Sequence, residues 1–114
     1  MKISEVSKLL CAKMICDHQL HAFDVEIGYS SDLMSDVLTL DTDNLLLITG
    51  MCNLQTIRTA EMADVHAIVF VRNKKASTEM IALAKEHGIC IMESPFTMFK
   101  ASGLLFNAGL KPVY

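Results

Sequence analysis

The chain has 114 residues, close to the commonest size of a single domain, and 52% of them are hydrophobic while 20% are charged. This balance excludes a disordered chain, and a formal net charge of −3 argues against a general nucleic-acid binder. No hydrophobic run approaches the ~20 residues that cross a bilayer, and the first residues lack a secretory signal. We therefore expect one cytoplasmic domain, residues 1–114, that binds neither nucleic acid nor membrane.

The first part of the chain predicts two helices and two strands. Ser4 can cap a helix that ends near residue 12, because hydrophobic residues follow it at helical spacing. Met14–Cys16 is a short hydrophobic run typical of a strand, and Phe23–Ile27 alternates as a half-buried strand does. Gly28–Ser31 interrupts this alternation. A second helix, capped by Ser31, would then carry its hydrophobic residues on one side: Leu33, Met34, Val37 and Leu38.

The rest of the chain predicts three strands, each followed by a helix. The strands are hydrophobic almost throughout, as expected of strands covered on both faces: Leu45–Thr49, Ala67–Val71 and Ile89–Met92. The helices are expected to begin at Asn53, at Ser77 and at Ser94-Pro95. This order predicts an α/β fold of three layers, with a mainly parallel sheet and helices on both faces. The strands before residue 28 could pair differently and make the sheet mixed.

The most plausible location for function is the turn at Thr49-Gly50, after the first of these strands. Ligands of parallel sheets collect outside the carboxyl ends of the strands. Gly50 would let a ligand approach the backbone, and the helix capped by Asn53 would offer free N–H groups to an anion. Taken by itself, a tight turn is the simpler interpretation. The polar edge that contains Asp32 and Asp36 could also face a ligand or a partner.

Motifs for catalysis are absent from the sequence. There is no phosphate-binding loop of the NTPases, no glycine-rich dinucleotide fingerprint and no nucleophile elbow, so we expect no enzyme. A thiol enzyme that uses Cys52 is a further hypothesis, since a cysteine just before a helix can have a lowered pKa, but no base lies near it in sequence.

We expect neither a metal site nor a cofactor. His18 and His21, beside Asp17, could share a metal, but three residues in a polar turn are weak support for one. The basic residues Arg72, Lys74 and Lys75 are expected to form a solvated loop. The cysteines are expected to be free and buried, acting as small hydrophobic residues: Cys11, Cys16, Cys52 and Cys90.

Four stretches of the sequence resemble the DRTGG domain, and together they span most of the chain: Gly28–Leu38, Leu46–Gly50, Ile57–Ala60 and Ser94–Gly103. The resemblance implies the same α/β layout, similar to the N-terminal domain of HPr kinase/phosphorylase. It also departs from the family's motif, because Tyr29 and Ser30 stand at the Asp-Arg positions and Met51 replaces the last glycine. Only Thr49 and Gly50 match the letters of the family's name.

The resemblance implies a non-catalytic regulatory or ligand-sensing domain. We expect this domain to form a homodimer. Its ligand would be an adenine nucleotide or another phosphate compound, and no kinase activity is expected because the phosphate loop is absent. The expected ligand-binding residues are Tyr29, Ser30, Ser31, Asp32, Thr49, Gly50 and Asn53. The alternative is an interaction module that docks on a metabolic or redox enzyme without a small-molecule ligand.

Overall fold

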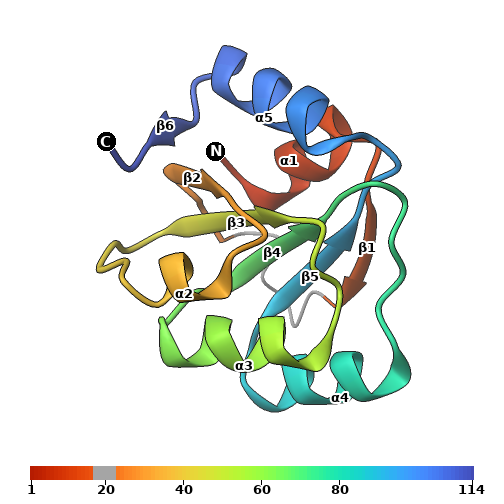
Figure 1. Cartoon of the computed structure of the whole chain (residues 1–114). Helices are drawn as coiled ribbons and strands as arrows, with labels where there is room; N and C mark the ends of the chain where they lie inside the picture. The colour runs from red at the N-terminus through yellow and green to blue at the C-terminus, as the bar shows by residue number, and fades with distance from the viewer. Residues whose placement is uncertain (17–22) are drawn as a thin grey trace.

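The computed structural model describes residues 1–16, without the side chain of Cys16, and residues 23–114. Its centre is a sheet of six strands in the order β1-β5-β4-β3-β2-β6 (Figure 1). The strands are β1 (Lys13–Cys16), β2 (Ile27–Ser30), β3 (Leu45–Thr49), β4 (Ala67–Phe70), β5 (Cys90–Glu93) and β6 (Lys111–Pro112). The helices are α1 (Ile3–Leu9), α2 (Met34–Val37), α3 (Leu54–Met62), α4 (Thr78–Glu86) and α5 (Met98–Asn107).

The sheet is parallel except at one edge. Strands β5, β4, β3, β2 and β6 run parallel to their neighbours, whereas β1 pairs with β5 in the antiparallel direction. Every residue of β3, β4 and β5 is buried, which is why these segments are hydrophobic without alternation. The expected mainly parallel sheet is therefore confirmed, and its N-terminal strand makes it mixed.

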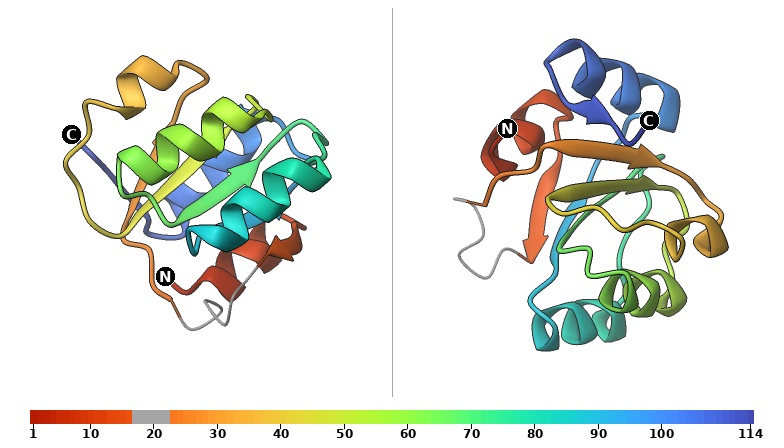
Figure 2. Two further views of the ribbon diagram at one scale, coloured as in Figure 1. Left: turned by 90° about the horizontal axis from the view of Figure 1, so that it is seen from below. Right: turned by 90° about the vertical axis from the view of Figure 1, so that its left-hand side faces the viewer.

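Helices cover both faces of the sheet, as the sequence predicts (Figure 2). On one face, α1 and α5 pack against side chains such as Leu46, Ile48 and Val69. On the other face, α2, α3 and α4 pack against side chains such as Leu47 and Phe70. Burial of these two hydrophobic clusters supplies the main driving force for folding. The result is the expected arrangement of three layers.

The prediction of a strand at Phe23–Ile27 is wrong, because the observed strand begins where the predicted one ends. Strand β2 is Ile27–Ser30, and before it Asp24 makes only an isolated bridge with Lys2. Gly28 lies inside this strand, where the side chain of Leu110 fills the space beside it. A Cβ added to Gly28 would lie 2.7 Å from Leu110 Cδ2, so a larger residue here would displace Leu110. Tertiary packing, which local alternation does not report, sets the position of β2.

Three of the expected helix starts also differ. Helix α1 begins after Lys2, so Ser4 lies inside it, and α5 begins after Thr97, whose side chain accepts a hydrogen bond from the Lys100 N–H. Helix α2 is a single turn that buries Met34 and Val37 but leaves Leu33 57% exposed. The caps expected for α3 and α4 are confirmed.

The cysteines are only partly as expected. Cys90 is buried and Cys52 is half-buried, but Cys11 is exposed, because it ends the turn after α1 with a φ of 49°. None of these three forms a disulfide with another described cysteine. None of the helices in the described part of the chain is long and apolar enough to cross a membrane.

Candidate functional site at the carboxyl edge of the sheet

The turn at Thr49-Gly50 is held by a carboxylate of the same chain. One oxygen of Asp32, Oδ1, accepts hydrogen bonds from the Gly50 N–H at 2.7 Å and from the Thr49 hydroxyl at 3.0 Å. The Thr49 oxygen in turn accepts a bond from the Met51 N–H at 3.1 Å. The Gly50 N–H, which could bind the anionic group of a ligand, is thus already paired with the carboxylate of Asp32.

Arg72 completes this group of residues. It lies just after β4, behind Val71, with a left-handed backbone (φ of 60°), and its guanidinium lies against Gly50. Its Nη2 atom is 3.5 Å from the Gly50 carbonyl oxygen and 3.8 Å from Asp32 Oδ2. A side chain on Gly50 would collide with the guanidinium, so glycine permits this approach. We call Asp32, Thr49, Gly50 and Arg72 the edge cluster.

The chemistry of the edge cluster is that of an anion site. A backbone N–H, a hydroxyl and a guanidinium converge on carboxylate oxygens, and the same donors bind phosphate. The side chains of Asp32 and Arg72 are 42% and 50% exposed, so both can change partners without leaving a buried charge. An incoming phosphate would compete with Asp32 for the Gly50 N–H and for Arg72.

Two of the expected ligand-binding residues serve as local caps. Asn53 accepts a hydrogen bond from the Thr56 N–H at 3.0 Å and so caps α3. Ser31 accepts a bond from the Leu33 N–H at 3.0 Å and forms the turn that leads into α2. Both bonds satisfy backbone donors that would otherwise be unpaired.

The remaining two expected residues lie on opposite faces of the sheet, because successive residues of β2 alternate. Tyr29 packs against the cluster under α2 and α3. Burial, followed by the charge of Asp36 and contact with Tyr114, raises the pKa of Tyr29 above its usual value. Ser30 faces α5, and its hydroxyl lies 2.6 Å from that of Ser102. The seven residues therefore do not form one site.

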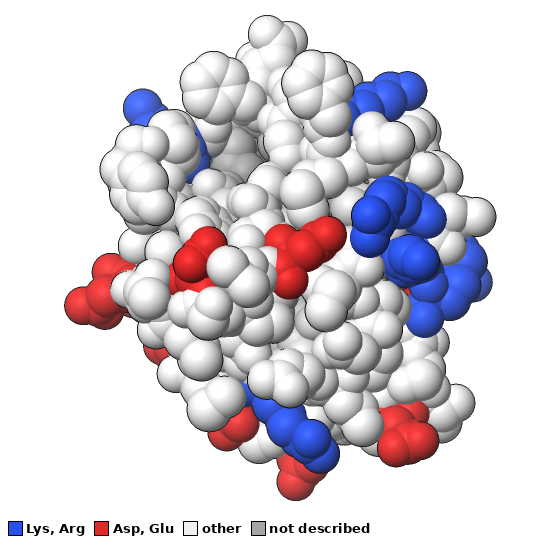
Figure 3. Space-filling model, in the orientation of Figure 1, with Lys and Arg blue, Asp and Glu red and all other residues white. Residues whose placement is uncertain are grey.

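Ser30 lines a pocket of about 360 Å³ between α5 and the β2–β6 edge of the sheet. Its hollow is visible in the upper part of the face shown in Figure 3. Phe99 and Phe106 stand at its rim and are 90% and 68% exposed. This pocket was not predicted from the sequence, where its trace is the spacing of Phe99, Gly103 and Phe106 on one side of a helix.

Glu93, the last residue of β5, also lies at this edge. Its side chain is 6% exposed, and its Oε2 atom accepts a hydrogen bond from the Ala76 N–H at 2.7 Å. Lys75 Nζ lies 3.7 Å from its other oxygen. Burial, and then the charge of Glu93, raise the pKa of the Cys52 thiol, against a smaller opposing effect of Lys74. A thiol with a raised pKa is a poor nucleophile at neutral pH, which argues against the hypothesis of a Cys52 enzyme.

The histidines described by the structure have local partners. His66 lies 3.0 Å from Asp64, and His87, the C-cap of α4, lies 3.7 Å from Glu61. The possible metal residues Asp17, His18 and His21 lie outside the described residues. Among residues 1–16 and 23–114, no three His, Cys, Asp or Glu side chains are grouped so that they could hold a metal ion.

No protein-family model matches the chain, and no curated protein matches its sequence. Among solved structures, the chain is similar to the crystal structure of the CBS and DRTGG domains of the regulatory region of Clostridium perfringens pyrophosphatase, complexed with its activator diadenosine tetraphosphate. The TM-score is 0.72 at 16% sequence identity, and the match covers 98% of this chain and 48% of that one. The chain thus spans about half the length of that regulatory region. The likeness confirms the expected DRTGG-like α/β fold.

Proposed function

We propose that this chain is a non-catalytic regulatory domain that senses a phosphate-containing ligand, such as an adenine nucleotide, at the edge cluster. The observation that carries the proposal is the convergence of the Gly50 N–H, the Thr49 hydroxyl and Arg72 on the carboxylate of Asp32. The similar Clostridium perfringens structure is a regulatory region in complex with a nucleotide activator, which supports the same class of function here.

Asp32 makes the edge cluster suited to sensing rather than to tight constitutive binding. In the free protein its carboxylate occupies the donors, and a phosphate that displaces it would release the loop between β2 and α2. Ligand binding would thus be coupled to a rearrangement of that loop, which is the requirement for a conformational signal. Nothing in the described part of the chain favours docking on a metabolic or redox enzyme.

The test is a thermal unfolding series with inorganic pyrophosphate, ATP and diadenosine tetraphosphate at millimolar concentration. A ligand at 100 times its dissociation constant adds about 2.7 kcal/mol to the free energy of unfolding, enough to raise the melting temperature by several degrees. We expect pyrophosphate and ATP to stabilise the wild-type protein, and Arg72→Gln to remove most of that effect.

Lys85→Gln is the matched control. Lys85 is exposed near the end of α4, so this substitution also removes one positive charge, but away from the edge cluster. The control should respond to pyrophosphate as the wild type does. Absence of any shift in the wild type with all three compounds, or an equal loss in both variants, would refute phosphate binding at the edge cluster.

We also propose that the domain forms a homodimer through the face shown in Figure 3. Basic side chains gather on one side of this face, over the loop that follows β4, and acidic side chains lie around α2 and beyond it. Exposed hydrophobic side chains of Leu33, Leu38 and Met51 belong to the same region of the fold. A twofold axis would bring the acidic side of one copy against the basic side of the other.

A further inference from the structure

We propose that the pocket between α5 and the β2–β6 edge binds a neutral, planar heteroaromatic ring of about the size of a nucleobase. This inference goes beyond the edge cluster, because the pocket shares no residue with it and is lined by side chains of the hydrophobic cluster under α1 and α5. Its volume of about 360 Å³ is within the range of small-molecule sites.

The walls of the pocket form a slot for a flat group. Phe99, Gly103 and Phe106 are spaced by four and three residues, so they lie on one side of α5, and the glycine leaves a gap between the two rings. A Cβ added to Gly103 would meet no atom within 4 Å. Opposite, the side chains of Leu110 and Ile48 lie over Gly28 and form an apolar wall. A flat ring can stack on the phenylalanine side of this pocket and contact the apolar wall with its other face.

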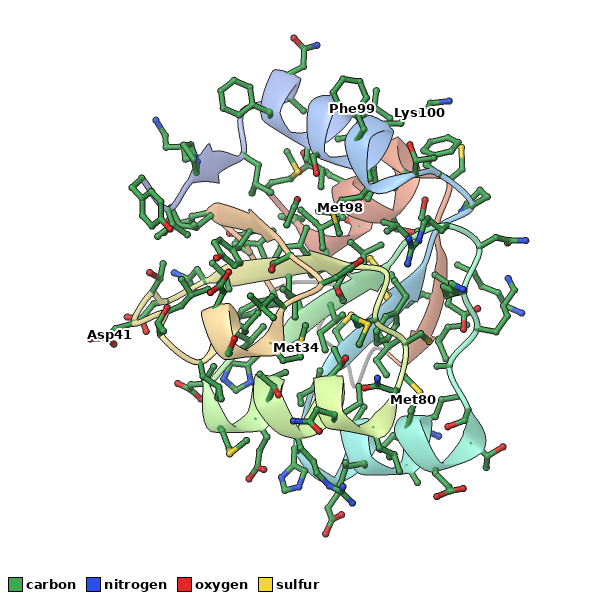
Figure 4. The ribbon with its side chains drawn as sticks, viewed as in Figure 1. Met34, Asp41, Met80, Met98, Phe99 and Lys100 are labelled. Carbon is green, nitrogen blue, oxygen red and sulfur yellow. The ribbon has the colours of Figure 1, made fainter. Side chains whose placement is uncertain are left out.

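The two phenylalanine rings supply the binding energy. Figure 4 shows Phe99 at the outer side of α5, and both rings are largely exposed to solvent in the free protein. Phe99 is 90% exposed, which is unusual for a large hydrophobic side chain beside a pocket. A stacked aromatic ligand would remove part of both rings from water, and stacking on an aromatic side chain contributes favourably for any base.

The polar groups of the pocket select a neutral ring with hydrogen-bonding atoms on its edge. The hydroxyls of Ser30 and Ser102 hydrogen-bond each other at 2.6 Å, and the pair keeps one O–H donor and acceptor lone pairs for a ligand. Lys111 is the sole charged residue among the described residues that line the pocket. With no carboxylate among them to pair with a cationic ring, the positive charge of Lys111 disfavours such a ring.

The test uses adenosine, which has the ring but no phosphate, in a titration followed by the amide resonances of the whole protein. We expect the largest shifts at Ser30, Ser102 and Gly103. Ribose should cause none. Gly103→Leu fills the slot and should weaken adenosine binding roughly tenfold, which is the effect expected from losing one stacking contact. Asn107→Leu, on the same helix but outside the pocket, is the matched control and should bind as the wild type does.

Gly103→Leu should fold, because leucine favours helix over glycine and the added Cβ meets no neighbour. Equal affinity of both variants, or shifts confined to Thr49 and Gly50, would overturn the proposal. So would concentration-dependent association that Gly103→Leu abolishes while adenosine has no effect, since the pocket would then serve a second copy of the chain. Pyrophosphate reports on the edge cluster in the same samples, so binding of one probe without the other shows which proposal fails.

Discussion

At the scale of single residues, the most informative finding is that Asp32 occupies the donors of the Thr49-Gly50 turn. The sequence predicts the turn and the glycine from the end of a hydrophobic run, and it places Asp32 among the candidate residues. It does not predict their hydrogen bonds, because Asp32 and Gly50 are 18 residues apart and meet only when β2 and β3 pair. Arg72 was expected to be merely solvated for the same reason: its position depends on β4 lying beside β3.

Removal of the Asp32 carboxylate should destabilise the protein and open the edge cluster. Asp32→Ala leaves the Gly50 N–H and the Thr49 hydroxyl without their acceptor, and we expect a loss of about 1–2 kcal/mol in the free energy of unfolding. Asp32→Asn retains an acceptor oxygen, so its loss should be smaller, and it should bind pyrophosphate more tightly because a competing negative charge is gone. Urea unfolding and calorimetric titration measure the two effects.

Asp36→Ala is the control for Asp32→Ala, because Asp36 lies four residues away on α2 and has no hydrogen bond to the turn. Its unfolding should be close to that of the wild type. Equal unfolding free energies for the two alanine variants would contradict a role of Asp32 in holding the turn. Weaker pyrophosphate binding by Asp32→Asn would show that the carboxylate assists the ligand instead of competing with it.

At the scale of elements, the long buried strands were predictable and the short exposed elements were not. Strands β3, β4 and β5 are hydrophobic runs of four or five residues, and their positions agree with the sequence to within one residue. Helix α2 has four residues, too few for its composition to define it, and its form depends on the Ser31 turn and on packing over β3. Helix α5 begins later than expected: the Ser94 hydroxyl donates to the Leu10 carbonyl and accepts a bond from the Phe96 N–H, and Thr97 caps the helix.

Two glycines, Gly103 in α5 and Gly88 after α4, test how the backbone conformation of a glycine decides the effect of replacing it with alanine. Gly103 lies within the helix and Gly88 follows α4 with a φ of 66°, yet a Cβ at either position would meet no atom within 4 Å. Gly103→Ala should therefore raise the free energy of unfolding by about 0.5–1 kcal/mol. Gly88→Ala should lower it by about 1 kcal/mol, because alanine is strained in the left-handed region. Thermal and urea unfolding of the two variants measure the difference, and changes of the same sign would refute this account.

At the scale of the whole molecule, the sequence predicted the three layers and the parallel direction of the sheet, because both follow from alternation of buried strands and helices. The pocket beside α5 could not be predicted from the sequence. That cavity depends on how β6 returns the chain to the edge of β2, and Lys111 and Pro112 carry no strand signal. The site at the carboxyl edge was half predictable: its strand end was evident, whereas the partners that fill it come from other strands.

The proposed homodimer predicts the mass of the protein in solution and the effect of salt on its association. Sedimentation equilibrium at micromolar concentration should give twice the mass of a 12.6 kDa chain, and high salt should weaken association by screening the acidic and basic sides of the face. Leu33→Ser should dissociate the dimer without loss of fold, since Leu33 is 57% exposed. Met62→Ser, at an exposed position at the end of α3, is the control. A monomeric mass at all concentrations would exclude the dimer.

Both borders of the sheet are poorly suited to extension by a further strand. Strand β6 has two residues, one of them a proline that has no N–H to offer, and β1 carries a shift of register between Met14 and Cys16. Such borders discourage the edge-to-edge pairing that leads parallel sheets into fibrils. These borders favour a partner that meets the chain through helices and loops over one that lengthens the sheet.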